Sequence, residues 1–322
     1  MDRLAELARD DMADVDAVIR SRMQSPVSVI PALADHIIEA GGKRLRPLLA
    51  VVAWRLAGAR GDGGLKLAAA VEFIHTATLL HDDVVDSSRL RRGKLAAHLI
   101  WGAPSSVLVG DFLFARAFEL MVETGSMRAM EILSRASRVI AEGEVLQLTR
   151  AHDLKLTQDT YLEIIAAKTA ELFAAAAEAG AVTAGASAAQ CAALRAYGLN
   201  LGLAFQLADD ALDYGGATET LGKDAGDDFR EGKATLPLLL AMARTGPREV
   251  EFWERAIGRK EQTELDFRKA RDLIVGVGAL DATLDLADEY AENAKAALSV
   301  FPLSEWRAGL EGLAEFAVSR RA

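Results

Sequence analysis

The sequence predicts an all-α fold. Helix-favouring alanine, leucine, glutamate and arginine dominate the 322 residues, and only seven prolines interrupt them. Apolar residues recur at helical spacing, whereas the polar–apolar alternation of a strand is sustained nowhere. Since no segment has the composition of a flexible linker, we expect one helical domain over residues 1–322.

Glycine, proline and polar residues separate the expected helices. These helices span residues 2–23, 29–40, 47–57, 65–86, 105–123, 126–150, 157–179 and 187–213. Residues 215–233 contain five glycines and many charges, so they predict a long polar loop of the kind that is usually functional in a compact domain. Helical periodicity resumes at Thr235.

Composition excludes several classes of protein. The net charge of −10 argues against a nucleic-acid surface, so an anionic ligand would need local basic groups or bound metal ions. The single cysteine, Cys191, allows no internal disulfide and favours a reducing, cytoplasmic location. The acidic N-terminus lacks the apolar core of a signal peptide. Residues 172–194 are too weakly apolar for a transmembrane segment and predict a buried helix pair.

Two acidic clusters close otherwise apolar helices. The first is Asp82, Asp83 and Asp86, and the second is Asp209, Asp210 and Asp213. Residues four apart share a helix face, so the carboxylates of each cluster lie close and repel one another unless a cation binds between them. Hard oxygen ligands of this kind suit Mg²⁺. One such cluster is usually a solvated helix end, but two of them favour a metal site.

Basic residues beside glycine turns complement these acids. Lys43, Arg44 and Arg46 follow a Gly-Gly turn, and Arg91 and Arg92 follow the first acidic cluster. Lys168 lies in an apolar helix, and Lys223 and Lys233 flank the polar loop. In a chain this acidic, their concentration favours an anion site, where arginine binds phosphate through two hydrogen bonds.

The motifs together resemble those of the trans-isoprenyl diphosphate synthases, and among them the long-chain polyprenyl type (octaprenyl, solanesyl, decaprenyl). The matching segments are GGKRLRP, EFIHTATLLHDDVVDSSRLRRGK, SVLVGDFLFARAF, GEVLQL, KTAELF, FQLADDALDY and GKDAGDDFREGKATLP, in family order over residues 41–238. The resemblance implies an isoprenoid synthase fold, a helical bundle around a deep central cavity, assembled as a homodimer. It also implies Mg²⁺-dependent condensation of isopentenyl diphosphate onto an allylic diphosphate, which makes the chain a prenyltransferase.

The resemblance also assigns individual residues. The catalytic set is Asp82, Asp83, Asp86, Lys168, Asp209 and Asp210. The metal ligands are the same aspartates with Asp213, for Mg²⁺ or, alternatively, Mn²⁺. Isopentenyl diphosphate would bind Lys43, Arg46, His75 and Arg92. The allylic diphosphate would bind Arg91, Lys168, Lys223 and Lys233, with Thr169 and Gln206 lining the reacting centre. Asp227 and Gln147 match more weakly.

Small residues one turn before the first cluster bear on product length. Ala77 and Thr78 lie about 6–8 Å along the helix from Asp82, where short-chain members of this family carry a bulky aromatic floor. Small residues here also suit close helix packing, but the overall resemblance favours a long product, and tyrosine at Ala77 is expected to shorten it. The product is expected to serve as a quinone side chain.

Three alternatives remain open. A short-chain farnesyl or geranylgeranyl synthase is the main alternative within the family. A terpene cyclase would carry a serine or threonine where this chain has Asp213. A non-catalytic subunit of a hetero-oligomeric synthase would lack aspartates from the clusters, and none is missing here.

Overall fold

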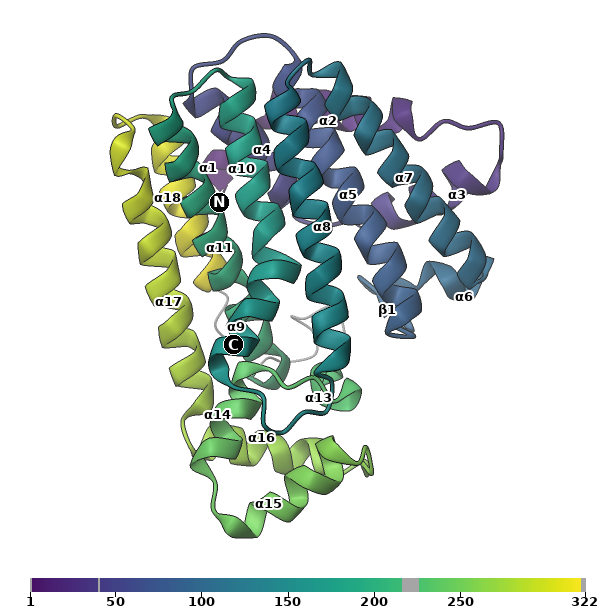
Figure 1. Ribbon diagram of the computed structural model, residues 1–322, viewed down its shortest axis with the longest axis vertical. Coiled ribbons are helices and arrows are strands. Elements are labelled where there is room, and N and C mark those ends of the chain that lie inside the picture. Colours follow the sequence, from purple (N-terminus) through teal and green to yellow (C-terminus); the bar gives the residue numbers. More distant parts are fainter. Residues whose placement is uncertain (1, 40, 216–225, 320–322) are drawn as a thin grey trace. The chain divides into compact units, whose positions relative to one another are not determined.

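The computed structural model describes residues 2–39, 41–215 and 226–319. These residues form helices and one short two-stranded hairpin, which confirms the all-α expectation (Figure 1). The helices group into two compact units, which we describe separately. The first unit comprises residues 1–137, 172–198 and 297–313, and the second comprises residues 138–171, 199–296 and 314–322. The single domain over residues 1–322 stays a prediction.

The first unit contains the N-terminal helices and the hairpin. Its elements are α1 (Asp2–Leu7), α2 (Arg9–Arg22), α3 (Val29–Glu39), α4 (Leu45–Leu56), α5 (Gly63–Val85), β1 (Leu90–Arg91), β2 (Lys94–Leu95), α6 (Ala97–Trp101) and α7 (Ala103–Glu123). Parts of α8 (Met127–Thr149), α10 (Glu171–Thr183), α11 (Ala188–Gly215) and α18 (Glu305–Val318), with the 3₁₀ turn Leu298–Val300, complete it.

Helix α5 forms the centre of the first unit. It packs against α2, α4 and α7, and it runs beside α7 in Figure 1. Its segment 67–71 has no exposed surface, because small alanines let neighbouring helices approach closely. Gly64 serves the same end, since a Cβ there would lie 2.3 Å from the Trp54 ring. This packing restrains α5, and α5 carries the first acidic cluster at its C-terminal end.

The second unit contains most of the C-terminal half. Its elements are α9 (Gln158–Ile165), a π-helical turn (Ala166–Ala170), α13 (Asp227–Glu231), α14 (Leu236–Arg244), α15 (Pro247–Trp253), a second π-helical turn (Glu254–Gly258), α16 (Asp266–Gly276) and α17 (Ala279–Ala297), with the remaining parts of α8, α11 and α18. One core cluster packs Tyr161, Ile165, Leu203 and Leu207 together. This cluster fixes α9 against α11, where the second acidic cluster lies.

The structure departs from the expected elements in four places. The helix expected over 2–23 is broken at Ala8 into α1 and α2. Helix α6 and the hairpin are additions, each too short to show a periodic pattern. Residues 227–231 of the expected loop are helical, because Gly226 and Gly232, both with positive φ, allow a short helix to start and stop there. Residues 216–225 lie outside the described part of the chain.

Residues 172–194 form α10, the turn after it and the start of α11. The segment from Leu172 to Ala177 is buried, which agrees with the expected buried helix pair. Among the described helices, none combines the length and the hydropathy that crossing a bilayer requires.

Candidate active site

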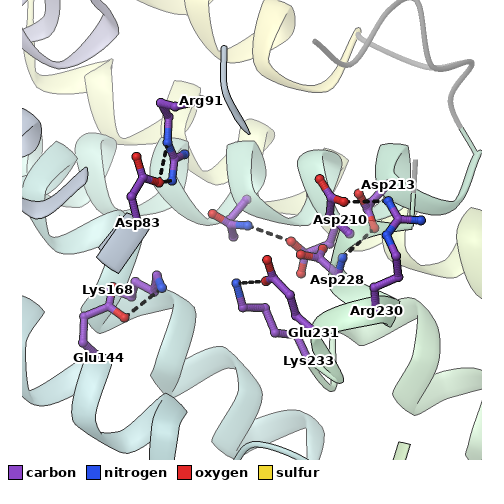
Figure 2. A network of polar contacts seen from close by, with 12 residues as sticks. Asp83, Arg91, Glu144, Lys168, Asp210, Asp213, Asp228, Arg230, Glu231 and Lys233 are labelled. Atoms are coloured by element: carbon purple, nitrogen blue, oxygen red, sulfur yellow. Dashed lines mark hydrogen bonds and ion pairs between the residues drawn. The ribbon is translucent and has the colours of Figure 1, made fainter. Parts of the chain in front are cut away.

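The first acidic cluster lies at the C-terminal end of α5. Asp83 has no exposed surface, whereas Asp82 and Asp86 are partly exposed. Arg91 reaches back from the hairpin, and its Nε donates to Asp83 Oδ1 at 2.9 Å while its Nη2 contacts the same oxygen (Figure 2). Only the carboxylate of this ion pair is fully buried, and losing Arg91 would leave that buried charge uncompensated. Arg91, eight residues after Asp83 in the sequence, therefore contacts the first acidic cluster directly.

The hairpin turn brings Arg91 into this position. Arg92 and Gly93 both have positive φ at the turn between β1 and β2. Burial by itself lowers the pKa of Arg91, but the hydrogen bond to Asp83 and the charges of Asp83, Asp82 and Asp86 outweigh it and raise that pKa. Arg91 therefore stays fully charged beside the three carboxylates.

A basic cluster lies further back along α5. Arg46 Nη1 donates to His75 Nε2 at 3.2 Å, and its guanidinium carbon lies 4.4 Å from the centre of the Phe173 ring. Burial lowers the pKa of His75 well below its usual value, and the charges of Arg46, Arg92, Arg91 and Arg44 lower it further. His75 is therefore neutral at pH 7, and its Nε2 accepts the arginine hydrogen bond. Lys43, which lies three residues before Arg46 in the sequence, is exposed.

One buried carboxylate balances the basic cluster. Arg44 Nη1 donates to Glu72 Oε1 at 2.8 Å, and Glu72 is only 4% exposed. Burial raises the pKa of Glu72 despite the opposing charges of Arg44, Arg92 and Arg46. Arg44 Nη2 also lies 3.8 Å from Asp16 Oδ1, so two carboxylates of the protein pair with Arg44.

Arg92 lies against the Gly41-Gly42 turn. Its Nη1 donates to the Gly41 carbonyl oxygen, and a Cβ at Gly42 would lie 2.7 Å from its guanidinium carbon. Burial, and the charges of Arg91 and Arg44, lower the pKa of Arg92 although Glu72 opposes them. Several arginines gathered in this way repel one another and favour an anion between them. Of the residues assigned to isopentenyl diphosphate, Arg46, His75 and Arg92 thus come together in the structure.

The second acidic cluster, in the second unit, lies near the C-terminal end of α11. Asp210 is 2% exposed, its Oδ2 accepts from the Tyr161 hydroxyl at 2.5 Å, and its Oδ1 accepts from Gln206 Nε2 at 2.7 Å. Burial and the charge of Asp228 raise the pKa of Asp210 to about 8. A carboxylate that resists ionisation in this way is stabilised by a bound cation. Asp209 is partly exposed one residue earlier.

A π-helical turn positions the two predicted residues of the KTAELF segment. Lys168 Nζ lies 2.8 Å from Glu144 Oε2, and Thr169 Oγ1 donates to Gln206 Oε1 at 2.9 Å. A Cβ at Gly143 would lie 3.0 Å from the Lys168 backbone nitrogen, so a glycine in α8 lets the wider turn approach. Single π turns inside α-helices are frequent at functional sites.

Helix α13 lies beside the end of the second cluster. Asp213 is fully buried, and its Oδ2 accepts from the Asp228 backbone N–H at 3.1 Å. Lys233 Nζ lies 2.5 Å from Glu231 Oε2 (Figure 2). Asp227 is paired with Arg230 at 2.6 Å. The role of Asp227, a weaker match in the sequence, stays a prediction. Lys223 lies outside the described residues.

Both clusters fit a hard divalent cation. No described residue hydrogen-bonds to Asp83 Oδ2, although this atom is buried, and Mg²⁺ is an ordinary partner for such an oxygen. In the described part of the chain no three His, Cys, Asp or Glu side chains converge on one point. Mg²⁺ does not require that, since it binds through one or two carboxylates and completes its shell with water and phosphate.

The chain-length residues differ in exposure. Ala77 has no exposed surface, so it packs against neighbouring side chains. Thr78 is partly exposed, and its Oγ1 donates to the His75 carbonyl oxygen at 2.8 Å. Thr78 lies four residues before Asp82 and therefore on the same helix face. Of the two residues, only Thr78 has solvent-accessible surface.

Sequence reasoning missed several partners in these networks, among them Glu72, Glu144, Tyr161 and Asp228. Glu72 carried a usable signal, because it lies three residues before His75 and shares its helix face. Glu144 lay within the quoted GEVLQL segment. Tyr161 gave no signal, since its hydrogen bond to Asp210 joins residues that are far apart in the chain.

Known proteins resemble this chain over nearly its whole length. A model of the family described as polyprenyl synthetase matches residues 27–274. The octaprenyl diphosphate synthase of Escherichia coli K12 is 45% identical over 320 residues, covering 99% of both chains. A crystal structure of a polyprenyl synthase from Caulobacter crescentus CB15, complexed with calcium and isoprenyl diphosphate, is 77% identical with a TM-score of 0.98, covering 100% of this chain and 98% of that one.

A second crystal structure supports the same relationship. That of a decaprenyl diphosphate synthase from Rhodobacter capsulatus is 51% identical with a TM-score of 0.94, covering 100% of this chain and 99% of that one. The acidic helix ends, the basic cluster and these relatives agree. The chain belongs to the polyprenyl synthetase family and is a prenyltransferase of the polyprenyl diphosphate synthase class.

Proposed function

We propose that this protein is a long-chain, all-trans polyprenyl diphosphate synthase. In this role it would add isopentenyl diphosphate units successively to an allylic diphosphate such as farnesyl diphosphate, with Mg²⁺ as its metal. The names of its relatives support a long product, since one is an octaprenyl and another a decaprenyl diphosphate synthase. A quinone side chain as the fate of the product, and a homodimer as the assembly, belong to the same proposal.

The proposal rests on two sites of opposite charge that lie along α5. His75, with Arg46, marks a basic site, and Asp82 begins the acidic one seven residues later. At 1.5 Å per residue the two sites are roughly 10 Å apart on one helix. One site can bind a diphosphate through arginines alone, and the other through metal ions and Arg91. The condensation requires two diphosphate substrates, and these two sites would bind them in different ways.

Each site has a separate task in the reaction. Mg²⁺, when bound, would withdraw negative charge from the allylic diphosphate. Asp82, Asp83 and Asp86 would hold the metal, while the guanidinium of Arg91, held in place by Asp83, would stabilise the charge on the departing diphosphate. The allylic C–O bond breaks with its electron pair on the diphosphate. The double bond of isopentenyl diphosphate then forms the new C–C bond, and the departing diphosphate takes the proton that is lost.

The second unit would supply further groups to the allylic diphosphate. Asp209, Asp210 and Asp213 are assigned to metal, and Lys168 and Lys233 to phosphate, together with Lys223. Lys168 is paired with Glu144 at 2.8 Å, so a phosphate would have to compete with this carboxylate for the ammonium group. Thr169 and Gln206 are hydrogen-bonded to each other, which fixes both side chains for contact with the reacting carbons.

Product sizing tests the proposed function. Purified protein is incubated with farnesyl diphosphate, labelled isopentenyl diphosphate and Mg²⁺, and the products are dephosphorylated and sized. We expect chains of octaprenyl length or longer, and no product when EDTA removes the metal. Farnesylgeranyl or shorter products as the main species would support a short-chain synthase. No product from this substrate pair in the presence of Mg²⁺ would support a non-catalytic subunit.

A further inference from the structure

The SVLVGDFLFARAF segment lies within α7, and several of its residues contact the end of α5 that carries the first acidic cluster. Ser106, which is fully buried, donates from Oγ to the Leu80 carbonyl oxygen at 3.2 Å. His81 Nε2 lies 3.1 Å from the Val107 carbonyl oxygen, to which its N–H donates. Two hydrogen bonds between side chain and backbone therefore join the helices immediately before Asp82.

Gly110 provides the space for the imidazole. A Cβ at this position would lie 2.2 Å from His81 Nε2 and 2.6 Å from its Cδ2, closer than any nonbonded contact allows. Glycine inside a helix costs about 1 kcal/mol relative to alanine, so its presence in α7 calls for a local reason. The His81 ring, which also stacks on Phe114 at 6.3 Å between centroids, is that reason.

Helix ends open more readily than helix interiors, and a metal site needs its ligands held within about 0.5 Å. Ser106 holds the Leu80 carbonyl of α5, and the His81 side chain attaches the next residue to the backbone of α7, so both residues immediately before Asp82 and Asp83 are anchored to α7. Asp83 itself is tied to Arg91 through its side chain, and its carbonyl oxygen accepts from the Ser88 N–H at 3.0 Å. The α7 contacts add a restraint from a neighbouring helix to these local ones.

We propose that His81 is a positioning residue, which with Gly110 and Ser106 holds Asp82 and Asp83 in the geometry that binds the divalent cation. This inference rests on the proposed metal role of those aspartates. His81 itself is not a ligand in this account, because its Nε2 is directed to α7. This inference gives Ser106 and Gly110 a role in a segment of α7 to which no substrate contact is assigned.

The experiment perturbs the contact from both sides. His81→Ala removes the imidazole, and Gly110→Ala displaces it. Each variant is expected to weaken Mn²⁺ binding about tenfold, measured by electron paramagnetic resonance of free Mn²⁺ in the presence of inorganic diphosphate. Turnover should fall by a similar factor, while the KM for isopentenyl diphosphate stays within about twofold. The double variant should bind Mn²⁺ no more weakly than the single variant with the lower affinity, because both substitutions remove the same contact.

Two further variants serve as controls. His81→Gln offers an amide N–H near the position of Nε2 and should recover Mn²⁺ affinity to within about threefold of the unaltered protein. Gly312→Ala, in α18, adds a Cβ with nothing within 4 Å and should change neither parameter. Circular dichroism establishes that each variant is folded. If His81→Ala does not fold, His81→Gln and Gly110→Ala carry the test.

Unchanged Mn²⁺ affinity in folded His81→Ala or Gly110→Ala would overturn the inference. So would additive losses in the double variant, or a loss of isopentenyl diphosphate affinity equal to that of Mn²⁺. Failure of the proposed function is distinguishable, because then the unaltered protein itself would make no product and bind no Mn²⁺ with diphosphate.

Discussion

Asp83→Ala is expected to lower turnover by about a thousandfold, the scale on which removal of one fixed electrostatic contact acts in an active site. Asp83 is the buried member of the first cluster, and its Oδ1 alone is occupied by Arg91. The substitution removes a proposed metal ligand and also removes the carboxylate that pairs with Arg91. Steady-state turnover with saturating substrates and Mg²⁺ measures the effect.

A second variant separates charge from packing. Asp83→Asn keeps the size of the side chain and an oxygen that accepts from Arg91, but it loses the negative charge. We expect a loss of about a hundredfold or more, with helix content unchanged. Asp285→Ala, at an exposed position on α17, is the matched control and should retain full activity. Near-normal turnover in Asp83→Asn would rule out a metal role for this carboxylate.

Thr78→Tyr is expected to shift the product to markedly shorter chains. Its side chain lies on the face of α5 that carries Asp82, about 6 Å along the helix axis. An aromatic ring there would block the growing chain after few additions, while the condensation itself continues. Mass analysis of the dephosphorylated products gives the length distribution, and turnover of the first condensation should change little.

Two substitutions make this result interpretable. Thr78→Val keeps the side-chain size and should leave the product length unchanged, which isolates the effect of bulk. Ala77→Tyr, expected from sequence to act in the same way, must displace packed neighbours because Ala77 has no exposed surface. It should therefore lower the melting temperature as well. An unchanged product distribution from folded Thr78→Tyr would place the growing chain elsewhere.

The sequence predicted the fold class and the acidic clusters because both are local patterns. Helical periodicity located α5 and α11 to within about two residues, which is normal for helix ends. The aspartates follow directly from spacing on those helices. The resemblance added the basic residues, and Arg46, His75 and Arg92 do come together in the first unit.

The partners of these residues were not predictable in the same way. Arg91 contacts Asp83 through a hairpin whose strands are two residues each, too short for any alternation to show. The Tyr161 hydroxyl finds Asp210 through packing of α9 on α11, a contact between distant parts of the chain. The π-helical turn at Lys168 has no periodic signature either, since it inserts one residue into an otherwise regular pattern.

Arg91 and Arg92 give the most direct test of the two-site account, because neighbouring arginines are assigned to different substrates. Arg91→Gln should raise the KM for farnesyl diphosphate about tenfold and leave the KM for isopentenyl diphosphate nearly unchanged, since it loses one charged contact. Arg92→Gln should show the reverse. If both variants raised the same KM, or both KM values equally, the division of the two diphosphates along α5 would be wrong.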